Sequence, residues 1–220
     1  MEQNYWPLGT WGRIPVAMHW TVLFVLVWLY FIFWSVPATL IAFVAYFTLL
    51  VAHESGHVFA LRRRKIPIES ISLYALHGRT SYGYASQGYS IVVAWAGVVA
   101  QLAILAIALA LRYSLDLHDY PLALMVVSPI LSVFIFGNLF LVAVALLPIG
   151  PFDGGAAWAV IPYTRAALRR RKQRKREIEL YPEKGLSPEK RRALEESSSK
   201  EAAELIGKFS KRADDRKEDA

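Results

Sequence analysis

Two histidines and a glutamate lie inside an apolar stretch of the sequence, LLVAHESGHVFALRRRK, which covers Leu49–Lys65. They fit the pattern H-E-x-x-H, with His53 and His57 four positions apart and Glu54 beside the first of them. On a helix, residues i and i+4 share one face, so both imidazoles can reach one metal ion. Zinc accepts such ligands and keeps an open position in catalytic sites. Glu54 is then placed to take a proton from a water molecule that the metal acidifies and to deliver it to a leaving amine.

A metal site of this kind needs a third protein ligand, and Asp153 is the strongest candidate. Apart from Glu54, it is the one acidic residue in or beside a long apolar run, where charges are costly and mark functional sites. Its segment, LLPIGPFDGG, also reads as a β-turn, and both roles are compatible because the two following glycines let the backbone turn. His19, His77 and His118 are weaker candidates.

The alternative to a metal site is a pair of interfacial histidines packed against other helices. That interpretation leaves three polar side chains in need of partners inside an apolar span. The chain has no cysteine, which excludes disulfides and any thiolate ligand.

Four apolar runs are long enough to cross a bilayer, which requires roughly 20 mostly apolar residues per helix. The hydrophobic fraction of 55% exceeds the usual range of soluble domains. We expect an α-helical polytopic membrane protein with about four core transmembrane helices, over Val16–Trp34, Ala38–Leu61, Ser90–Leu111 and Leu122–Leu147. The apolar piece Gly154–Tyr163 is too short to span and is expected to be re-entrant or interfacial.

The basic clusters Arg62–Lys65 and Arg169–Arg176 predict the orientation in the cell membrane. Cytosolic loops carry an excess of Lys and Arg, so both clusters are expected in the cytosol. The loop Arg112–Tyr120 has no such excess and is expected outside. Both termini are therefore expected to be cytosolic, and the active site is expected near the cytosolic face because His57 lies close to Arg62.

Between the second and third expected helices, the segment Ile66–Gly88 has the pattern of a small β-hairpin or sheet. Ile71, Leu73 and Ala75 alternate with other side chains at a period of two, and His77-Gly78 offers a turn.

From Thr164 onward the sequence becomes dense in charge, although the whole chain has a net charge of only +7. We expect two domains: a membrane-embedded core, residues 1–163, and a charged cytosolic tail, residues 164–220, that is solvated and partly helical or disordered. The cluster Arg169–Arg176 can also contact anionic lipid headgroups. Nucleic acid is not an expected partner, because positive charge is the only feature compatible with it and nothing else in the sequence supports it.

Four segments, in this order, resemble the site-2 protease family of intramembrane zinc metalloproteases. They are GRIPVAMHW (12–20), HESGHVFALRRRKIPIESISLYALHG (53–78), AGVVAQL (96–102) and NLFLVAVALLPIGPFDGG (138–155). The resemblance covers most of Gly12–Tyr163. It implies that His53, His57 and Asp153 bind one Zn²⁺ per chain and that Glu54 is the catalytic acid/base.

The sequence departs from the family's pattern at three positions. The asparagine before Leu-Leu-Pro is Ala145 here, and the proline and asparagine of the third segment are Val98 and Gln101. In the family these amides are thought to steady the substrate backbone or the transition state. Gln101 can substitute, whereas Ala145 cannot donate a hydrogen bond. Gln101 and Asn138 are candidate substrate-binding residues, with helix packing the favoured role of Asn138.

The resemblance predicts an enzyme that hydrolyses peptide bonds in or near transmembrane segments of membrane proteins, in regulated intramembrane proteolysis within the lipid bilayer. The substrate helix must unwind locally, and the hairpin Ile68–Ala85 can offer it an edge strand. One alternative is a non-catalytic pseudo-protease that binds membrane proteins, which Ala145 favours. A metal transporter is a third reading, but it needs more polar residues along its path than His19, Thr21 and Gln101.

Overall fold

The structure is a computed structural model and describes residues 4–115, 120–180 and 185–218. The chain divides into two compact units, Met1–Tyr163 and Thr164–Ala220. His118 and the centre of the loop expected outside the cell lie beyond the described residues.

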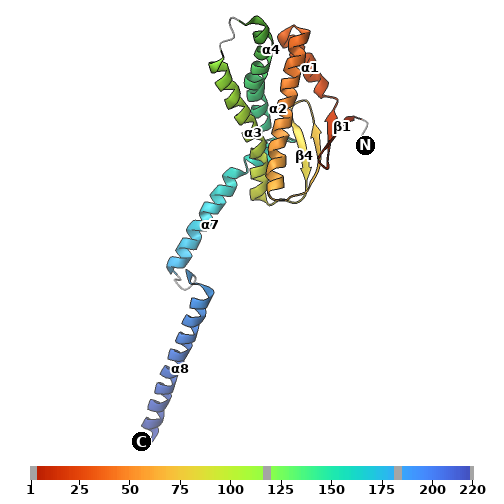
Figure 1. The fold of residues 1–220 in the computed structure, drawn as a ribbon. Coiled ribbons are helices and arrows are strands. Elements are labelled where there is room, and N and C mark those ends of the chain that lie inside the picture. Colours follow the sequence, from red (N-terminus) through yellow and green to blue (C-terminus); the bar gives the residue numbers. More distant parts are fainter. Residues whose placement is uncertain (1–3, 116–119, 181–184, 219–220) are drawn as a thin grey trace. The chain divides into compact units, whose positions relative to one another are not determined.

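Three long apolar helices dominate the first unit (Figure 1). They are α2 (Val36–Arg63), α3 (Gln87–Ser114) and a continuous helix over Pro121–Ala145, built from α4 (Pro121–Ser132), the π-helical turn η1 (Val133–Gly137) and α5 (Asn138–Ala145). Each is long and apolar enough to cross a membrane. The structure therefore forms helices over the second, third and fourth expected spans, and the fold is helical and polytopic.

The first expected span, Val16–Trp34, is wrong as a single helix. Its first part is the strand β2 (Ile14–His19), and only α1 (Val22–Phe33) is helical. Twelve residues at 1.5 Å each give about 18 Å, which is short of the roughly 30 Å of a bilayer core. Apolar composition alone does not distinguish a buried strand from a helix, and here pairing with a distant strand decides the outcome.

The strands form one four-stranded sheet in the order β1-β2-β3-β4. Its outer members are β1 (Tyr5–Trp11) and β4 (Gly78–Tyr82), and β2 pairs in parallel with β3 (Ile68–Leu73). The β3–β4 pair confirms the hairpin expected between the second and third spans. The sequence did not indicate that N-terminal strands extend it. Figure 1 shows the sheet beside the second half of α2, onto which it packs through a small apolar cluster: Ile14, Val58, Ile71 and Leu73.

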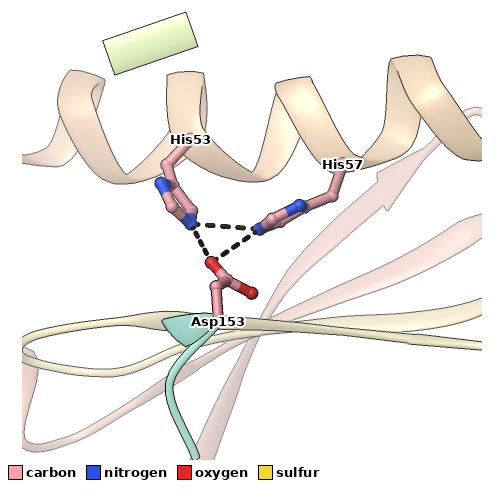
Figure 2. A group of neighbouring side chains, drawn as sticks. All are labelled: His53, His57 and Asp153. Carbon is pink, nitrogen blue, oxygen red and sulfur yellow. Dashed lines mark hydrogen bonds and ion pairs between the residues drawn. The ribbon is translucent and has the colours of Figure 1, made fainter. Parts of the chain in front are cut away.

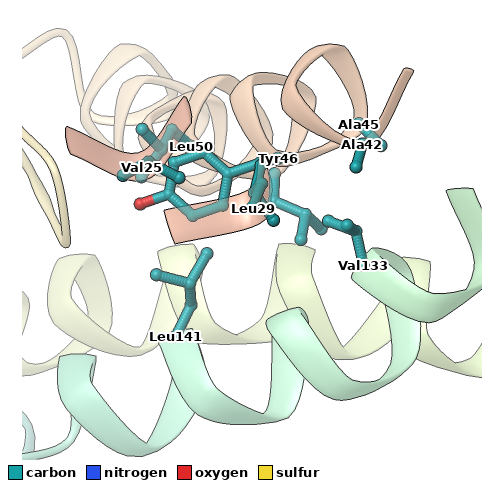
Figure 3. Packing of buried hydrophobic residues seen from close by; sticks show 9 residues of the cluster. Val25, Leu29, Ala42, Ala45, Tyr46, Leu50, Val133 and Leu141 are labelled. Atoms are coloured by element: carbon teal, nitrogen blue, oxygen red, sulfur yellow. The ribbon is translucent and has the colours of Figure 1, made fainter. Parts of the chain in front are cut away.

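The main apolar core holds the first half of α2 in place (Figure 3). Val25 and Leu29 of α1 and Leu141 of α5 pack around Tyr46 and Leu49 of α2. The second half of α2, which carries the H-E-x-x-H pattern, packs instead on α3 and the sheet. The histidines of the site therefore lie in the half of α2 that packs on α3 and the sheet.

After α5 the chain turns into the short helix α6 (Gly154–Ala157), and α7 (Val160–Leu180) follows. The apolar piece Gly154–Tyr163 thus becomes α6 and the start of α7. The second unit is helical over the rest of α7 and over α8 (Pro188–Glu218), and α7 has no buried residue. Helix α8 carries ion pairs between residues four positions apart, for example Lys200 Nζ to Glu196 Oε1 at 3.0 Å, which add some local stability.

Candidate metal centre

His53, His57 and Asp153 converge at one point between α2 and α6 (Figure 2). Both histidines project from one face of α2, and Asp153 reaches them from the start of α6. Asp153 Oδ2 lies 2.8 Å from His53 Nε2 and 3.2 Å from His57 Nε2, and the two Nε2 atoms are 3.0 Å apart. Residues one hundred positions apart in sequence therefore share one polar cluster, in which the histidines are buried and Asp153 is partly buried.

The other nitrogen of each ring has its own partner. His57 Nδ1 lies 2.8 Å from the main-chain carbonyl of Val93, which can only accept, so this nitrogen donates. His53 Nδ1 lies 3.0 Å from the side-chain oxygen of Gln101, which also accepts. In neutral imidazoles, both Nε2 atoms then present lone pairs toward Asp153.

Two lone pairs and a carboxylate oxygen cannot satisfy one another by hydrogen bonds, and a cation at their centre satisfies all three. Two imidazoles and one carboxylate are a zinc ligand set, with bonds of about 2.0–2.2 Å. Tetrahedral geometry with such bonds separates ligand atoms by roughly 3.3 Å, close to the distances found here. The residues present fit a zinc ion.

Asp153 is held in its charged form. Burial alone would raise the pKa of its carboxyl group, but in the metal-free site hydrogen bonds and positive charge from His53 and His57, when their Nε2 atoms carry protons, hold that pKa well below its ordinary value. A bound cation would take the place of those protons. The ionised carboxylate is the form that a metal requires.

Glu54 lies beside this cluster and is covered by strand β4. It is only 1% exposed, and Thr80 Oγ1 donates a hydrogen bond to its Oε2 at 2.5 Å. Its Oε1 has no hydrogen-bond partner within the described part of the chain. A Cβ atom on Gly78 would lie 2.0 Å from Oε1, so only glycine lets the strand approach this closely. One carboxylate oxygen is thus left free for a further proton donor.

Gly97 makes room for the two imidazoles. A Cβ at this position of α3 would lie 2.7 Å from ring atoms of both His53 and His57, closer than van der Waals contact allows. The neighbours of Gly97 across the interface between α3 and α2 are therefore these two rings.

The two expected substrate-binding residues, Gln101 and Asn138, lie deep between helices. Gln101 is 2% exposed and accepts from His53, while Asn138 is fully buried and its Nδ2 donates to the main-chain oxygen of Gln101 at 2.8 Å. Gln101 also lines a small cavity beside the cluster, together with Ala145. Asn138 therefore joins α5 to α3, in keeping with the packing role favoured for it.

Two contacts were not foreseen from the sequence: the carbonyl of Val93 and the hydroxyl of Thr80. His77, a weaker ligand candidate from the sequence, is outside the three-residue cluster but lines the same small cavity as His53 and Asp153. A main-chain carbonyl gives no signal in a sequence. Thr80 carried the only available hint, because it lies on the expected returning strand. His19 lies outside the cluster, with Nδ1 2.9 Å from Thr21 Oγ1.

The fold is similar to that of a solved structure, the Site-2 Protease from Methanocaldococcus jannaschii. The match covers 73% of this chain and 72% of that chain, with a TM-score of 0.56 and 24% sequence identity. No protein-family profile and no curated protein matches the sequence. The chain is thus a helical membrane protein with the fold of that protease and a His-His-Asp cluster in which both histidines are buried.

Proposed function

We propose that this protein is an intramembrane zinc metalloprotease that hydrolyses peptide bonds in or near transmembrane segments of membrane proteins. The observation that carries the proposal is the convergence of His53, His57 and Asp153, with lone pairs directed inward, next to the buried Glu54. The similarity in fold to a solved site-2 protease supports it.

One Zn²⁺ per chain is held by His53, His57 and Asp153 in this proposal. When bound, zinc polarises the scissile carbonyl group and acidifies a water molecule. The two histidines are kept in the ligating tautomer by Val93 and Gln101, as partners beyond the metal ligands commonly do.

Glu54 moves the proton. Its unpartnered Oε1 takes a proton from the attacking water while the water oxygen bonds to the carbonyl carbon. The C–N bond then breaks, and Glu54 returns the proton to the leaving amine. The second proton of the water also passes to the amine, so one water is consumed, one carboxylate and one ammonium group are formed, and Glu54 ends as it began. Thr80 holds the other carboxylate oxygen throughout.

The substrate is a membrane-spanning protein, unwound locally beside β4. Strand β4 is the last in the sheet order, so its outer edge is free to pair with an extended peptide within the described part of the chain. A cavity of about 170 Å³ lies along this strand, lined by Arg79 and Thr80 as well as His57 and Asp153. A peptide on this edge would pass next to the metal cluster. In this proposal Gln101 also contacts the substrate, from the small cavity.

We place the enzyme in the cell membrane with its site near the cytosolic face. Arg62 and Arg63 end α2 less than two turns after His57, and basic residues favour the cytosolic side. Residues 1–163 form the membrane-embedded enzyme and residues 164–220 a cytosolic tail, with both termini in the cytosol.

Proteolysis of candidate single-span membrane proteins tests the proposal. Zinc-loaded wild-type protein should cleave at least one of them, and a chelator should stop cleavage. Glu54→Gln should keep zinc and lose at least about 10³-fold in rate, because the proton acceptor is gone. Asp153→Ala should lose both the cleavage activity and the bound zinc. Cleavage by Glu54→Gln at the wild-type rate would refute the mechanism.

A non-catalytic binder of membrane proteins is the second candidate, and one feature favours it. Ala145 lines the small cavity without a hydrogen-bonding group, where the family resemblance expects asparagine. Wild-type protein that binds zinc and a substrate without cutting it would support this candidate. Gain of cleavage in Ala145→Asn would then identify the missing group.

A further inference from the structure

The small cavity beside the metal cluster is large enough for a group the size of a water molecule. Its volume is about 20 Å³, and a water molecule needs roughly 10–15 Å³ by this measure. Its lining includes His53 and Asp153 of the metal cluster as well as His77 and Gly78. A peptide carbonyl oxygen is about the size of a water molecule, so the cavity can hold one carbonyl oxygen next to the metal cluster.

His77 brings an unused hydrogen-bonding group to this cavity. Within the described part of the chain, its ring nitrogens make no hydrogen bond to another residue, although the ring is partly buried. A neutral imidazole has one N–H donor and one acceptor nitrogen. Burial, the charge of Arg79 and that of His53 lower the pKa of His77 and outweigh the opposite effect of Asp153. The ring is therefore neutral at pH 7 and carries one free donor.

The ring of His77 is held rigidly. It stacks on Tyr74 with centroids 4.7 Å apart and planes 7° from parallel, and the ring of Phe152 meets it edge-on at 5.3 Å. The hydroxyl groups of Tyr74 and Tyr5 are 2.6 Å apart, which ties this stack to β1.

The loop that carries His77 is also fixed to the protein. The main-chain nitrogen of Tyr74 donates to the carbonyl of His77 at 2.9 Å, and the hydroxyl of Tyr46 on α2 donates to the carbonyl of Ala75. Donors that are placed before the reaction stabilise a developing charge most effectively, because they need not reorganise.

We infer that His77 is a catalytic residue that donates a hydrogen bond to the oxyanion formed from the scissile carbonyl. The inference rests on the proposed protease function. His77 would also supply the hydrogen-bond donor that Ala145, which lines the same cavity, cannot provide. The bond strengthens as negative charge develops on the oxygen, so it lowers the barrier rather than tightening substrate binding.

Kinetics of His77→Ala and His77→Gln, measured on zinc-loaded protein, test this role. We expect His77→Ala to lower kcat roughly 10²-fold or more with KM within threefold, as when other oxyanion donors are removed. His77→Gln keeps an N–H donor and should recover part of the loss. Tyr113→Phe is the control, since Tyr113 is 88% exposed near the end of α3 and does not line the cavity, and it should stay within twofold of wild type.

Two further measurements separate this role from a structural one. Zinc content should remain one per chain in His77→Ala; loss of zinc would show a role in the metal site instead. A phosphinic dipeptide, in which –PO₂⁻–CH₂– replaces the peptide bond, mimics the oxyanion. His77→Ala should bind this probe at least tenfold more weakly than wild type.

The outcomes for His77 and for the protease proposal are distinguishable. If wild type cleaves substrate and His77→Ala does so equally well, the role of His77 is refuted and the protease remains. If wild type cleaves nothing, the protease proposal fails. An equal dissociation constant of the phosphinic probe for wild type and His77→Ala refutes the oxyanion role in either case.

Discussion

The Nδ1 atoms of His53 and His57 determine how this site can hold a metal. Each of them donates to an acceptor on α3, the side chain of Gln101 or the main chain of Val93, and this leaves both Nε2 atoms to face Asp153. The chain can therefore bind a cation without first changing a tautomer. Gln101, which the sequence suggested for substrate binding, has a second task in this arrangement.

Replacing Gln101 by Leu should weaken zinc binding about 10- to 100-fold, the usual effect of removing such a partner from a metal-bound histidine. The reason is that His53 Nδ1 loses its acceptor and the ring loses its fixed orientation. Competition with a chelator of known affinity measures the change. Asn138→Leu is the matched control: it breaks only a bond to the Gln101 main chain and should leave zinc affinity within threefold. Equal affinities of both variants would contradict the role of Gln101.

The lowered pKa of His77 makes a pH dependence of stability testable. Folding keeps this ring neutral, so the stability that it contributes is complete above the ordinary pKa of 6.5 and is lost as the pH falls through the lower pKa of the folded state. Metal-free wild type should therefore lose more thermal stability than His77→Gln between pH 7.5 and pH 5. Burial of the ring is the main cause of the lowered pKa; Asp153 opposes it, and the charges of Arg79 and His53 add to it. If the melting temperatures of wild type and His77→Gln fall by the same amount over this pH range, the predicted shift of the His77 pKa is refuted.

At the scale of elements, the close contact between α2 and α3 forms the site. Gly97 is the position on α3 that permits it, because any Cβ there would collide with both metal-binding rings. Glycine on a helix is unfavourable by about 1 kcal/mol relative to alanine. An alanine at position 97 would therefore stabilise the isolated helix, but it would displace the metal-binding rings.

We therefore expect Gly97→Ala to lower zinc affinity at least tenfold, since one or both imidazoles must shift away from Asp153. Val99→Ala is the control on the same helix; Val99 is 58% exposed and should not affect zinc. Isothermal titration of metal-free protein measures both. If Gly97→Ala bound zinc as tightly as wild type, α2 and α3 could move apart without disturbing the metal ligands, and this prediction would be wrong.

The sequence predicts some of these elements well, for physical reasons that can be named. The spacing of His53 and His57 places them on one helical face, and a lone acid beside an apolar run indicated Asp153. Long apolar runs indicated α2, α3 and the helix that ends in α5. These signals are local, or they follow from the cost of burying charge.

Other elements could not be predicted because they depend on distant partners. The strand β2 is apolar enough for a helix, and its pairing with β3, through Val16 and Ile71, makes it a strand. The contacts of Val93 and Thr80 depend on how closely α3 and β4 approach α2. The tautomer of His57 depends in turn on the contact with Val93.

At the scale of the whole molecule, the chain separates an apolar unit from a charged one. The boundary between the two compact units lies at Tyr163–Thr164. All residues of the metal cluster, Glu54 and His77 belong to the first unit. The second unit contributes exposed helices rich in charge.

Truncation after Tyr163 should therefore leave the site intact. We expect the shortened protein in detergent to bind one zinc per chain and to cleave substrate within about threefold of the full-length rate. Any contact of the tail with anionic lipid is absent in detergent, so its loss should not affect this assay. A truncated protein that folds, by circular dichroism and gel filtration, but binds no zinc would show that the tail takes part in the site.

The central claim is that one zinc ion is bound by His53, His57 and Asp153, and X-ray absorption at the zinc edge of the purified protein tests it most directly. The spectrum should show two imidazole nitrogens and at least one oxygen ligand at about 2.0–2.2 Å. His53→Ala should lose one imidazole contribution, and Asp153→Ala should lose an oxygen ligand or the zinc itself. Protein that contains no zinc after reconstitution, or a spectrum that is unchanged in both variants, would contradict the account.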